Sequence, residues 1–442
     1  MISSYMSRRW TLLAALFATL LCAFSSLPTA AAGESGAAAK IKLSLEADAV
    51  DGMCELGDTV LFTAELECRG KIGKSATLQW SVETVAFEAP LIEQVELELA
   101  AGETASFVYS LEMKTPGFVQ VSCTISEEDA KKDVMRSRRI GCEPTKVLSA
   151  LTAESDLEEF WAGSLKELAA VAPEYELIKQ EVKEGADHEL YEVVMRSFGG
   201  ARVRGWLQLP LTDGPHPALL RVPGYTQNMR PLDSANEAVV FSFNIRGHGR
   251  STDDVPGQPV DYWVRGLDDR DSYYYRGAYL DCVRAVDFLC SREDVDTDQI
   301  AIWGASQGGG LAFATAALDE RIDLCVSDIP WLCDWKNYLE LAGKNDDEEI
   351  QAWLRAKPER TPESTLKTLS YFDTMNLAHR IKCPTLMGVG LQDSICPPST
   401  SFATYNRITA PRDYRIYEDS GHGLGWGHIE WVISEMKERF GG

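Results

Sequence analysis

Apolar and polar residues alternate with a period of two between residues 41 and 142. The pattern is clear in Val60–Cys68, Leu78–Val82 and Val119–Cys123, and glycines and charged residues separate such runs. Alternate side chains of a strand point to the same face, so each run can bury one face against a partner sheet. Short strands at this spacing predict an antiparallel β-sandwich over residues 40–145, with no helix of useful length.

The hydrophobic period changes after residue 145. Apolar residues at helical spacing among acidic ones predict a linker helix within residues 149–172. From about residue 190 the pattern alternates between strand and helix, which is typical of a mostly parallel sheet with helices on both faces. The predicted strands are Val203–Leu209, Ala218–Val222, Val239–Asn244, Ile300–Trp303, Leu324–Ile329, Thr385–Gly390 and Tyr414–Tyr417.

Two helices of this second region are clear from their spacing, Tyr279–Leu289 and Ile429–Phe440. Between residues 331 and 378 the charged residues have helical spacing and no strand pattern occurs. This predicts a helical insert, and a cap of this kind shapes substrate entry. The sequence therefore predicts an α/β domain over residues 150–442 that carries the insert.

The amino terminus has a pattern of its own. Arg8 and Arg9 precede a charge-free apolar run, and the small residues of 30–32 follow it. This predicts a cleaved signal peptide over residues 1–32, and hence a secreted or periplasmic protein with no membrane span in the mature chain. Cys22 leaves a lipoprotein anchor as the alternative, although Leu21 stands where such signals carry a small residue.

Export changes how the cysteines are interpreted, because disulfides persist outside the cytoplasm. Cys68 and Cys123 both fall on the apolar side of their predicted strands, and Trp80 lies between them in sequence. The order Cys, Trp, Cys resembles the immunoglobulin-type bridge between two sheets, so the sandwich is predicted to be immunoglobulin-like. Two buried free thiols are the alternative.

Composition and charge narrow the function further. With 45% hydrophobic and 25% charged residues among 442, the chain is typical of globular proteins with two or three domains. The formal net charge of -24 argues against binding to nucleic acid or to an anionic membrane surface, since both need a basic face.

Gly304-Ala305-Ser306-Gln307-Gly308 matches the Gly-x-Ser-x-Gly pattern. A predicted strand runs directly into it, and a small-residue helix at 310–318 follows. Strand, sharp turn and helix make up a nucleophile elbow, in which the flanking glycines leave the serine hydroxyl exposed. Ser306 is therefore the candidate nucleophile, and a tight structural turn is the alternative.

A serine nucleophile needs a base and an acid that orients the base. In this fold they follow in the order Ser, Asp, His, which Asp393 and His422 satisfy, each after a predicted strand. Asp328 and Asp419 are rivals for the acid. His428 opens the last helix, and we interpret it as a capping or surface residue.

Hydrolysis of an ester also needs two backbone donors for the oxyanion. Gln307 N–H is one candidate, and Tyr225 N–H, in the Pro223-Gly224-Tyr225 turn after a predicted strand, is the second. An ordinary Pro-Gly turn is the alternative there. We expect the Arg246-Gly247-His248 loop to brace the site. The sequence has no metal-binding or dinucleotide-binding motif, so we predict no metal and no cofactor.

These residues together resemble the acetyl xylan esterase and cephalosporin-C deacetylase family of carbohydrate esterases over about residues 155–440. The resemblance implies an α/β-hydrolase that removes acetyl groups from sugar hydroxyls, with Ser306, Asp393 and His422 as its triad and Tyr225 and Gln307 as its oxyanion donors. The segments that carry it are Arg246-Gly247-His248, Tyr273–Gly277 with Asp281, Gly304–Gly309, Leu369–Asp373 and Gly390–Thr400.

Three features depart from that family. Residue 248 is His where the family usually has Gln, Gly423 follows His422 where the family usually has Glu, and the β-sandwich precedes the hydrolase. Family members commonly form hexamers of a single domain, and an extra domain can block such an assembly, so a homo-oligomer stays an open alternative.

The function predicted from the sequence is a secreted serine carboxylesterase for polysaccharide degradation. Its substrates would be acetylated xylan, xylo-oligosaccharides or other acetylated sugars, with the sandwich as a spacer or a glycan-binding module. Two alternatives remain. One is an α/β-hydrolase of another acyl class, such as a general esterase, thioesterase or acyltransferase, and the other is a glycan-binding protein with an inactive hydrolase domain.

Overall fold

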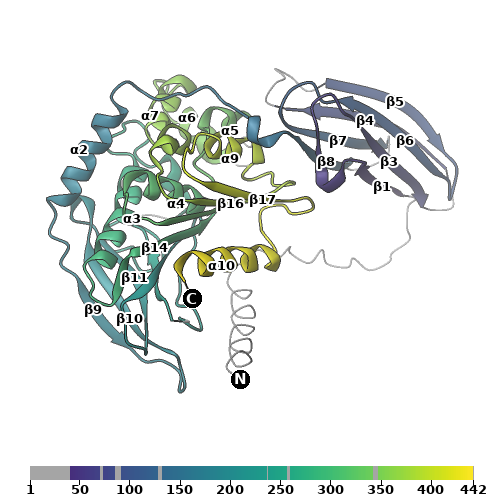
Figure 1. The fold of residues 1–442 in the computed structure, drawn as a ribbon. Coiled ribbons are helices and arrows are strands. Elements are labelled where there is room, and N and C mark those ends of the chain that lie inside the picture. The colour runs from purple at the N-terminus through teal and green to yellow at the C-terminus, as the bar shows by residue number, and fades with distance from the viewer. Residues whose placement is uncertain are drawn as a thin grey trace, which may run out of the picture. The chain divides into compact units, whose positions relative to one another are not determined.

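The computed structural model describes residues 40–69, 73–84, 91–127, 132–235, 237–255, 259–341 and 347–441. The chain divides after Leu148 into two compact units, and residues 417–419 group with the first of them (Figure 1). The predicted signal peptide at 1–32, with Cys22, lies outside the described residues. Among the described helices, none is both long and apolar enough to cross a membrane.

The amino-terminal unit consists of two sheets. Strand β3 of the first sheet buries every second side chain, including Phe62 and Leu66, as its period of two predicts. The first sheet has the order β1 (Lys40–Ala47), β3 (Thr59–Arg69), β6 (Thr104–Glu112). The second has the order β2 (Met53–Cys54), β8 (Val134–Cys142), β7 (Gly117–Glu127), β4 (Lys74–Glu83), β5 (Leu91–Leu99). One hydrophobic cluster contains side chains of both sheets, which is the arrangement of a β-sandwich.

The two cysteines of interest lie in that cluster. Cys68 is on β3 and Cys123 is on β7, so they belong to different sheets, and both are fully buried. Trp80, on β4, is also buried and stacks on Tyr109 of the opposite sheet at 5.6 Å between ring centroids. Cys123 is a free thiol in the structure, so it forms no bridge between the sheets. The immunoglobulin-like assignment stays a prediction.

The second unit is built on a nine-stranded sheet. Its strands are β9 (Glu176–Gln180), β10 (His188–Arg196), β11 (Arg202–Pro210), β12 (His216–Val222), β13 (Val239–Asn244), β14 (Val295–Ala305), β15 (Leu324–Asp328), β16 (Thr385–Gly390) and β17 (Arg412–Tyr417). They lie in the order β17-β16-β15-β14-β12-β13-β11-β10-β9. The pairs among β12 to β16 are parallel, whereas β9, β10 and β11 pair antiparallel at one edge.

The seven strands predicted for this unit are present, but β9 and β10 are not predicted by the sequence pattern. Strand β9 has no buried residue, because it lies at the edge of the sheet, so no apolar alternation marks it.

Helices cover both faces of the sheet (Figure 1). The helix α10 (Trp426–Phe440) packs with Ala301 and Trp303 of β14. On the other face, α4 (Gln307–Leu318) accepts a hydrogen bond at its Gly309 carbonyl from Ser327 Oγ of β15, beside α3 (Tyr274–Cys290). The unit also contains α2 (Leu157–Ala169), in the predicted linker, and α9 (Pro398–Tyr405).

Four helices occupy the region of the predicted insert, namely α5 (Trp335–Leu341), α6 (Asp347–Arg355), α7 (Pro362–Ser370) and α8 (Thr374–Leu377). Asp373 joins α5 to α8, because its buried carboxylate accepts hydrogen bonds from the backbone N–H groups of Asp334, Trp335 and Met375. Burial raises the pKa of Asp373 to about 7. Its three bonds fix the start of α5 next to α8.

Candidate active site

Ser306 occupies the sharp turn between β14 and α4. Its backbone angles, φ 60° and ψ -120°, are strained for a residue with a side chain. The neighbouring glycines permit this turn: a Cβ on Gly304 would lie 2.4 Å from the Gly308 carbonyl oxygen, and one on Gly308 would lie 2.8 Å from the Val222 oxygen. Backbone atoms therefore lie too close to Gly304 and Gly308 for either position to carry a side chain.

The side chains of Ser306, His422 and Asp393 form one chain of hydrogen bonds. His422 Nδ1 lies 2.8 Å from Asp393 Oδ2, and His422 Nε2 lies 3.0 Å from Ser306 Oγ. The carboxylate can only accept, so Nδ1 carries the proton and the unprotonated Nε2 accepts from the Ser306 hydroxyl. The structure thus brings together the three residues predicted for nucleophile, base and acid.

Backbone groups hold Asp393 in place. It follows β16, has no solvent exposure, and accepts hydrogen bonds at Oδ1 from the N–H groups of Ile395 and Cys396, at 2.8 and 2.9 Å. The other oxygen, Oδ2, remains for His422. His422 follows β17, and 22% of its side chain is exposed, so the candidate base lies at the solvent boundary.

The two predicted oxyanion residues lie close to each other. Gln307 opens α4, and its side-chain Nε2 donates to the Pro223 carbonyl at 3.2 Å, two residues before Tyr225. The Tyr225 hydroxyl donates to Glu349 Oε1 of α6 at 3.2 Å, and its ring meets Trp331 edge to face. The turn that carries Tyr225 is therefore attached to the nucleophile elbow on one side and to the insert on the other.

The Arg246-Gly247-His248 loop braces the elbow, as the sequence predicts. His248 Nε2 lies 3.2 Å from Gln307 Nε2, and the Arg246 guanidinium forms a bidentate ion pair with Asp281 of α3. Tyr275 also reaches the elbow, because its hydroxyl donates to Gln307 Oε1 at 2.6 Å. The sequence analysis places Tyr275 in the Tyr273–Gly277 segment but does not find this role, since Tyr275 and Gln307 are 32 residues apart.

The rival acids have other environments. Asp328 lies under the elbow, where it accepts hydrogen bonds from His428 Nε2 at 2.6 Å and Trp303 Nε1 at 2.7 Å. Asp419 is 83% exposed. The prediction that His428 is a capping or surface residue is wrong, because His428 is 1% exposed. The first turn of α10 faces the sheet, and the buried carboxylate pairs with this imidazole.

Asp393, Cys396 and His422 could be considered as metal ligands, since their ligand atoms lie within 4.8 Å of one another. His422, however, hydrogen-bonds to Asp393 through Nδ1 and to Ser306 through Nε2. Cys396 Sγ lies 4.0 Å from Ser306 Oγ. The arrangement fits activation of the serine better than coordination of an ion.

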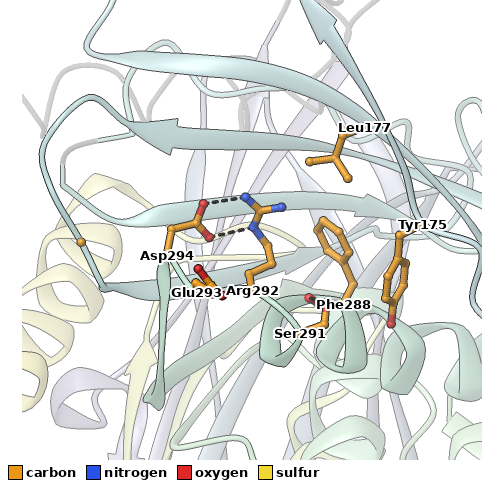
Figure 2. A pocket seen from close by; sticks show the side chains of 8 residues that line it. Tyr175, Leu177, Phe288, Ser291, Arg292, Glu293 and Asp294 are labelled. Atoms are coloured by element: carbon orange, nitrogen blue, oxygen red, sulfur yellow. Dashed lines mark hydrogen bonds and ion pairs between the residues drawn. The ribbon is translucent and has the colours of Figure 1, made fainter.

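A hollow of about 660 Å³ lies at the opposite end of β14, lined by Tyr175, Phe288, Arg292 and Asp294 among others (Figure 2). Arg292 is held there by two hydrogen bonds to Asp294, 2.8 and 2.5 Å long. Because β14 has 11 residues, this hollow is roughly 30 Å from Ser306. It is separate from the triad.

A family model described as acetyl xylan esterase (AXE1) matches residues 145–438. The acetyl esterase Axe7A of Xylanibacter ruminicola is 30% identical over 337 residues, which cover 73% of each chain.

Two solved structures are similar to the hydrolase unit. An acetyl xylan esterase from Paenibacillus sp. R4 is 35% identical with a TM-score of 0.62, and it covers 67% of this chain and 98% of its own. Acetyl Xylan Esterase 1 from Thermoanaerobacterium sp. JW/SL YS485 is 34% identical with a TM-score of 0.63, covering 67% and 97%. These likenesses confirm the predicted α/β-hydrolase fold.

Proposed function

This chain belongs to the acetyl xylan esterase family of serine carboxylic ester hydrolases, and we propose that it removes acetyl groups from sugar hydroxyls through an acyl-enzyme on Ser306. The observation that carries the proposal is the unbroken chain of hydrogen bonds from Ser306 through His422 to Asp393. A hydroxyl, a neutral imidazole and a buried carboxylate in this order supply a nucleophile, its base and the group that orients the base.

The first half of the reaction acylates the serine. His422 Nε2 takes the Ser306 proton as Oγ attacks the acetyl carbonyl carbon, and Asp393 stabilises the imidazolium that forms. The carbonyl oxygen becomes an oxyanion, to which the backbone N–H groups of Gln307 and Tyr225 donate. The intermediate collapses, His422 gives its proton to the sugar oxygen, and the sugar leaves with its hydroxyl restored.

The second half releases acetate. A water molecule replaces the sugar, His422 removes one of its protons, and the resulting tetrahedral intermediate uses the same two N–H donors. Collapse of this intermediate returns the proton to Ser306 and frees acetate. This chemistry uses only side chains and backbone groups of the chain itself.

The substrates are acetylated xylan or xylo-oligosaccharides, or other acetylated sugars. Support comes from the relatives, whose names are acetyl esterase and acetyl xylan esterase. A secreted or periplasmic location would place the enzyme near such polymers, and the predicted signal peptide at 1–32 supports it. The β-sandwich would then act as a spacer or bind glycan.

The experiment that tests the proposal is acetate release by the wild-type chain from acetylated xylan, other acetylated glycans and acetylated monosaccharides. Faster release from the xylan substrates than from the other sugars is the expected result. Equal rates on all sugars would instead indicate a general sugar deacetylase, and no release from any of them would contradict the deacetylase proposal.

A further inference from the structure

His248 is a buried histidine that the proposed reaction does not use. It follows β13 in the loop that the Arg246–Asp281 ion pair ties to α3, and it is 2% exposed. Its ring is packed beside that of Tyr262, with 5.3 Å between the centroids. A buried imidazole needs hydrogen-bond partners for both nitrogens, so its contacts show which neighbouring groups it fixes in position.

The Gln307 side chain has three hydrogen-bond partners, one at Oε1 and two at Nε2. Its Oε1 accepts from the Tyr275 hydroxyl at 2.6 Å, and its Nε2 lies 3.2 Å from both the Pro223 carbonyl oxygen and His248 Nε2. An amide nitrogen has two protons and no lone pair to share, so both of these contacts require acceptors. The opposite amide orientation would place Oε1 3.2 Å from the Pro223 carbonyl oxygen, and two acceptors cannot bond to each other.

It follows that His248 Nε2 is the acceptor and that its proton is on Nδ1. Two groups face Nδ1, the Tyr274 hydroxyl at 3.2 Å and the Arg246 carbonyl at 3.4 Å. Tyr274 donates its own proton to the Arg246 carbonyl at 2.6 Å, which leaves its oxygen free to accept from Nδ1–H. These neighbours select one neutral tautomer of His248.

The Gln307 side chain also connects the two halves of the oxyanion site. Its own backbone N–H is one proposed donor, and its Nε2 holds the Pro223 carbonyl at the start of the turn that carries the other, Tyr225 N–H. The positions of the two donors therefore depend on the orientation of one amide. A displacement of about 1 Å at such a site can cost a factor of about 100 in rate.

We propose that neutral His248, together with Tyr275, is a positioning residue that locks the Gln307 amide and so sets the distance between the two oxyanion donors. This inference rests on the proposed function and extends it to a residue outside the triad. It acts on the transition state, because the oxyanion forms only there, and so it affects kcat much more than KM.

Burial supports the neutral state that this role requires. It lowers the pKa of His248 to about 4, and the hydrogen bond to the Arg246 carbonyl and the charge of Asp281 oppose that shift only in part. The other groups that face the ring are Tyr274, Tyr262 and the Gln307 amide. Arg246 faces it with its backbone carbonyl, and the positive charge of its guanidinium is paired with Asp281.

The main test replaces the acceptor in two ways. In His248→Gln, Oε1 is separated from Cα by the same number of bonds as Nε2 in histidine, so it can accept the same hydrogen bond. In His248→Phe the flat ring remains beside Tyr262, but the acceptor is lost. With p-nitrophenyl acetate we expect His248→Phe to lower kcat about tenfold or more at nearly unchanged KM, and His248→Gln to stay within about threefold of wild type.

A matched pair on α3 keeps the inference testable if His248→Phe fails to fold. Tyr275 and Tyr279 are both fully buried, lie one turn apart, and each donates a hydrogen bond, to Gln307 Oε1 and to the Phe372 carbonyl respectively. Tyr275→Phe and Tyr279→Phe therefore remove the same group at similar burial. Only Tyr275→Phe should lower kcat, by about fivefold, since only it releases the Gln307 amide.

The outcomes separate this inference from the function on which it rests. A wild-type chain without esterase activity would mean that the proposed function is wrong. An active wild type whose folded His248→Phe variant keeps its kcat would overturn the positioning role, as would equal effects of Tyr275→Phe and Tyr279→Phe. A loss of kcat in His248→Phe that His248→Gln does not restore would show a dependence on the imidazole itself, and would also overturn it.

Discussion

The Ser306 hydroxyl forms a 3.0 Å hydrogen bond with His422 Nε2, which in the proposed reaction removes its proton. Ser306→Ala should fold normally, because the alanine fits the same turn, and should lower kcat for p-nitrophenyl acetate by several orders of magnitude. The remaining rate would come from the oxyanion donors and binding. Activity is measured beside a thermal unfolding scan, and a folded variant with wild-type kcat would rule out Ser306 as the nucleophile.

His248 also makes stability depend on pH. Burial lowers its pKa from 6.5 to about 4, so between these values the unfolded chain binds a proton that the folded chain does not. The free energy of unfolding therefore has its full value, as far as His248 is concerned, above pH 6.5. It decreases as the pH falls towards 4. The decrease amounts to about 3 kcal/mol, from 1.36 kcal/mol per pKa unit.

Urea unfolding at pH 7.5 and pH 4.5 measures this loss. His248→Gln has no group that titrates in this range, so its free energy of unfolding should fall by about 2 to 3 kcal/mol less than that of the wild type on acidification. Equal losses in the two proteins would show that His248 is not buried and neutral.

At the scale of elements, the nucleophile elbow is set by contact between β12, β14 and α4. A Cβ on Gly308 would lie 2.8 Å from the backbone oxygen of Val222, and backbone atoms cannot move away as a flexible side chain can. Gly308→Ala should therefore destabilise the hydrolase unit by roughly 1 to 3 kcal/mol and lower activity.

The matched control for this change is Gly163→Ala on α2. A Cβ on Gly163 would meet no other atom within 4 Å, so the substitution should be neutral or stabilising by up to about 1 kcal/mol, as in an open helix. The denaturant midpoints of the two variants, each compared with that of the wild type, measure these changes in stability. If Gly308→Ala behaves like Gly163→Ala, the elbow is less tightly packed than the structure indicates.

The helical insert and the aromatic residues beside it should limit the acyl group to a short chain. Trp331 meets the Tyr225 ring edge to face at 5.5 Å, and the fully buried Trp335 packs behind Trp331 at 5.4 Å. We expect kcat/KM for p-nitrophenyl acetate to exceed that for the butyrate by at least about tenfold, or about 1.4 kcal/mol in the transition state.

Trp331→Ala tests the origin of that preference. Removing the indole should open space near Tyr225 and reduce the acetate-to-butyrate ratio, because a methylene in an open apolar pocket gains about 0.8 kcal/mol. Equal activity of the wild type on both esters would indicate an open acyl channel and a general esterase.

At the scale of the whole molecule, the chemistry belongs to one unit. The triad and the proposed oxyanion donors all lie between Tyr225 and His422, within the unit that begins at Ser149. A chain that lacks residues 33–144 should therefore keep kcat for p-nitrophenyl acetate within about threefold, because none of the groups that act in the transition state is removed.

Acetate release from acetylated xylan, measured with the same truncated chain, tests the sandwich. If the sandwich binds glycan, the truncation should raise KM for the polymer and leave the small ester unaffected. Loss of activity towards p-nitrophenyl acetate in a folded truncated chain would show that the first unit supports the active site.

The sequence by itself determined the parts of this protein that have local signals. A period of two or of 3.6 marks any segment that buries one face, so seven strands of the hydrolase sheet and its helices α3 and α10 could be predicted. The Gly-x-Ser-x-Gly turn and the order of Ser306, Asp393 and His422 along the chain pointed to three side chains that the fold joins by hydrogen bonds of 3.0 and 2.8 Å.

Only the tertiary structure decided which buried polar groups pair with each other. His428 and Asp328 are 100 residues apart, and His248 and Gln307 are 59 apart, so no spacing in the sequence links them. Strand β9 joins an exposed edge where no apolar pattern is needed. Such contacts are chosen by the cost of leaving a buried donor or acceptor unpaired, and that cost exists only once the chain is packed.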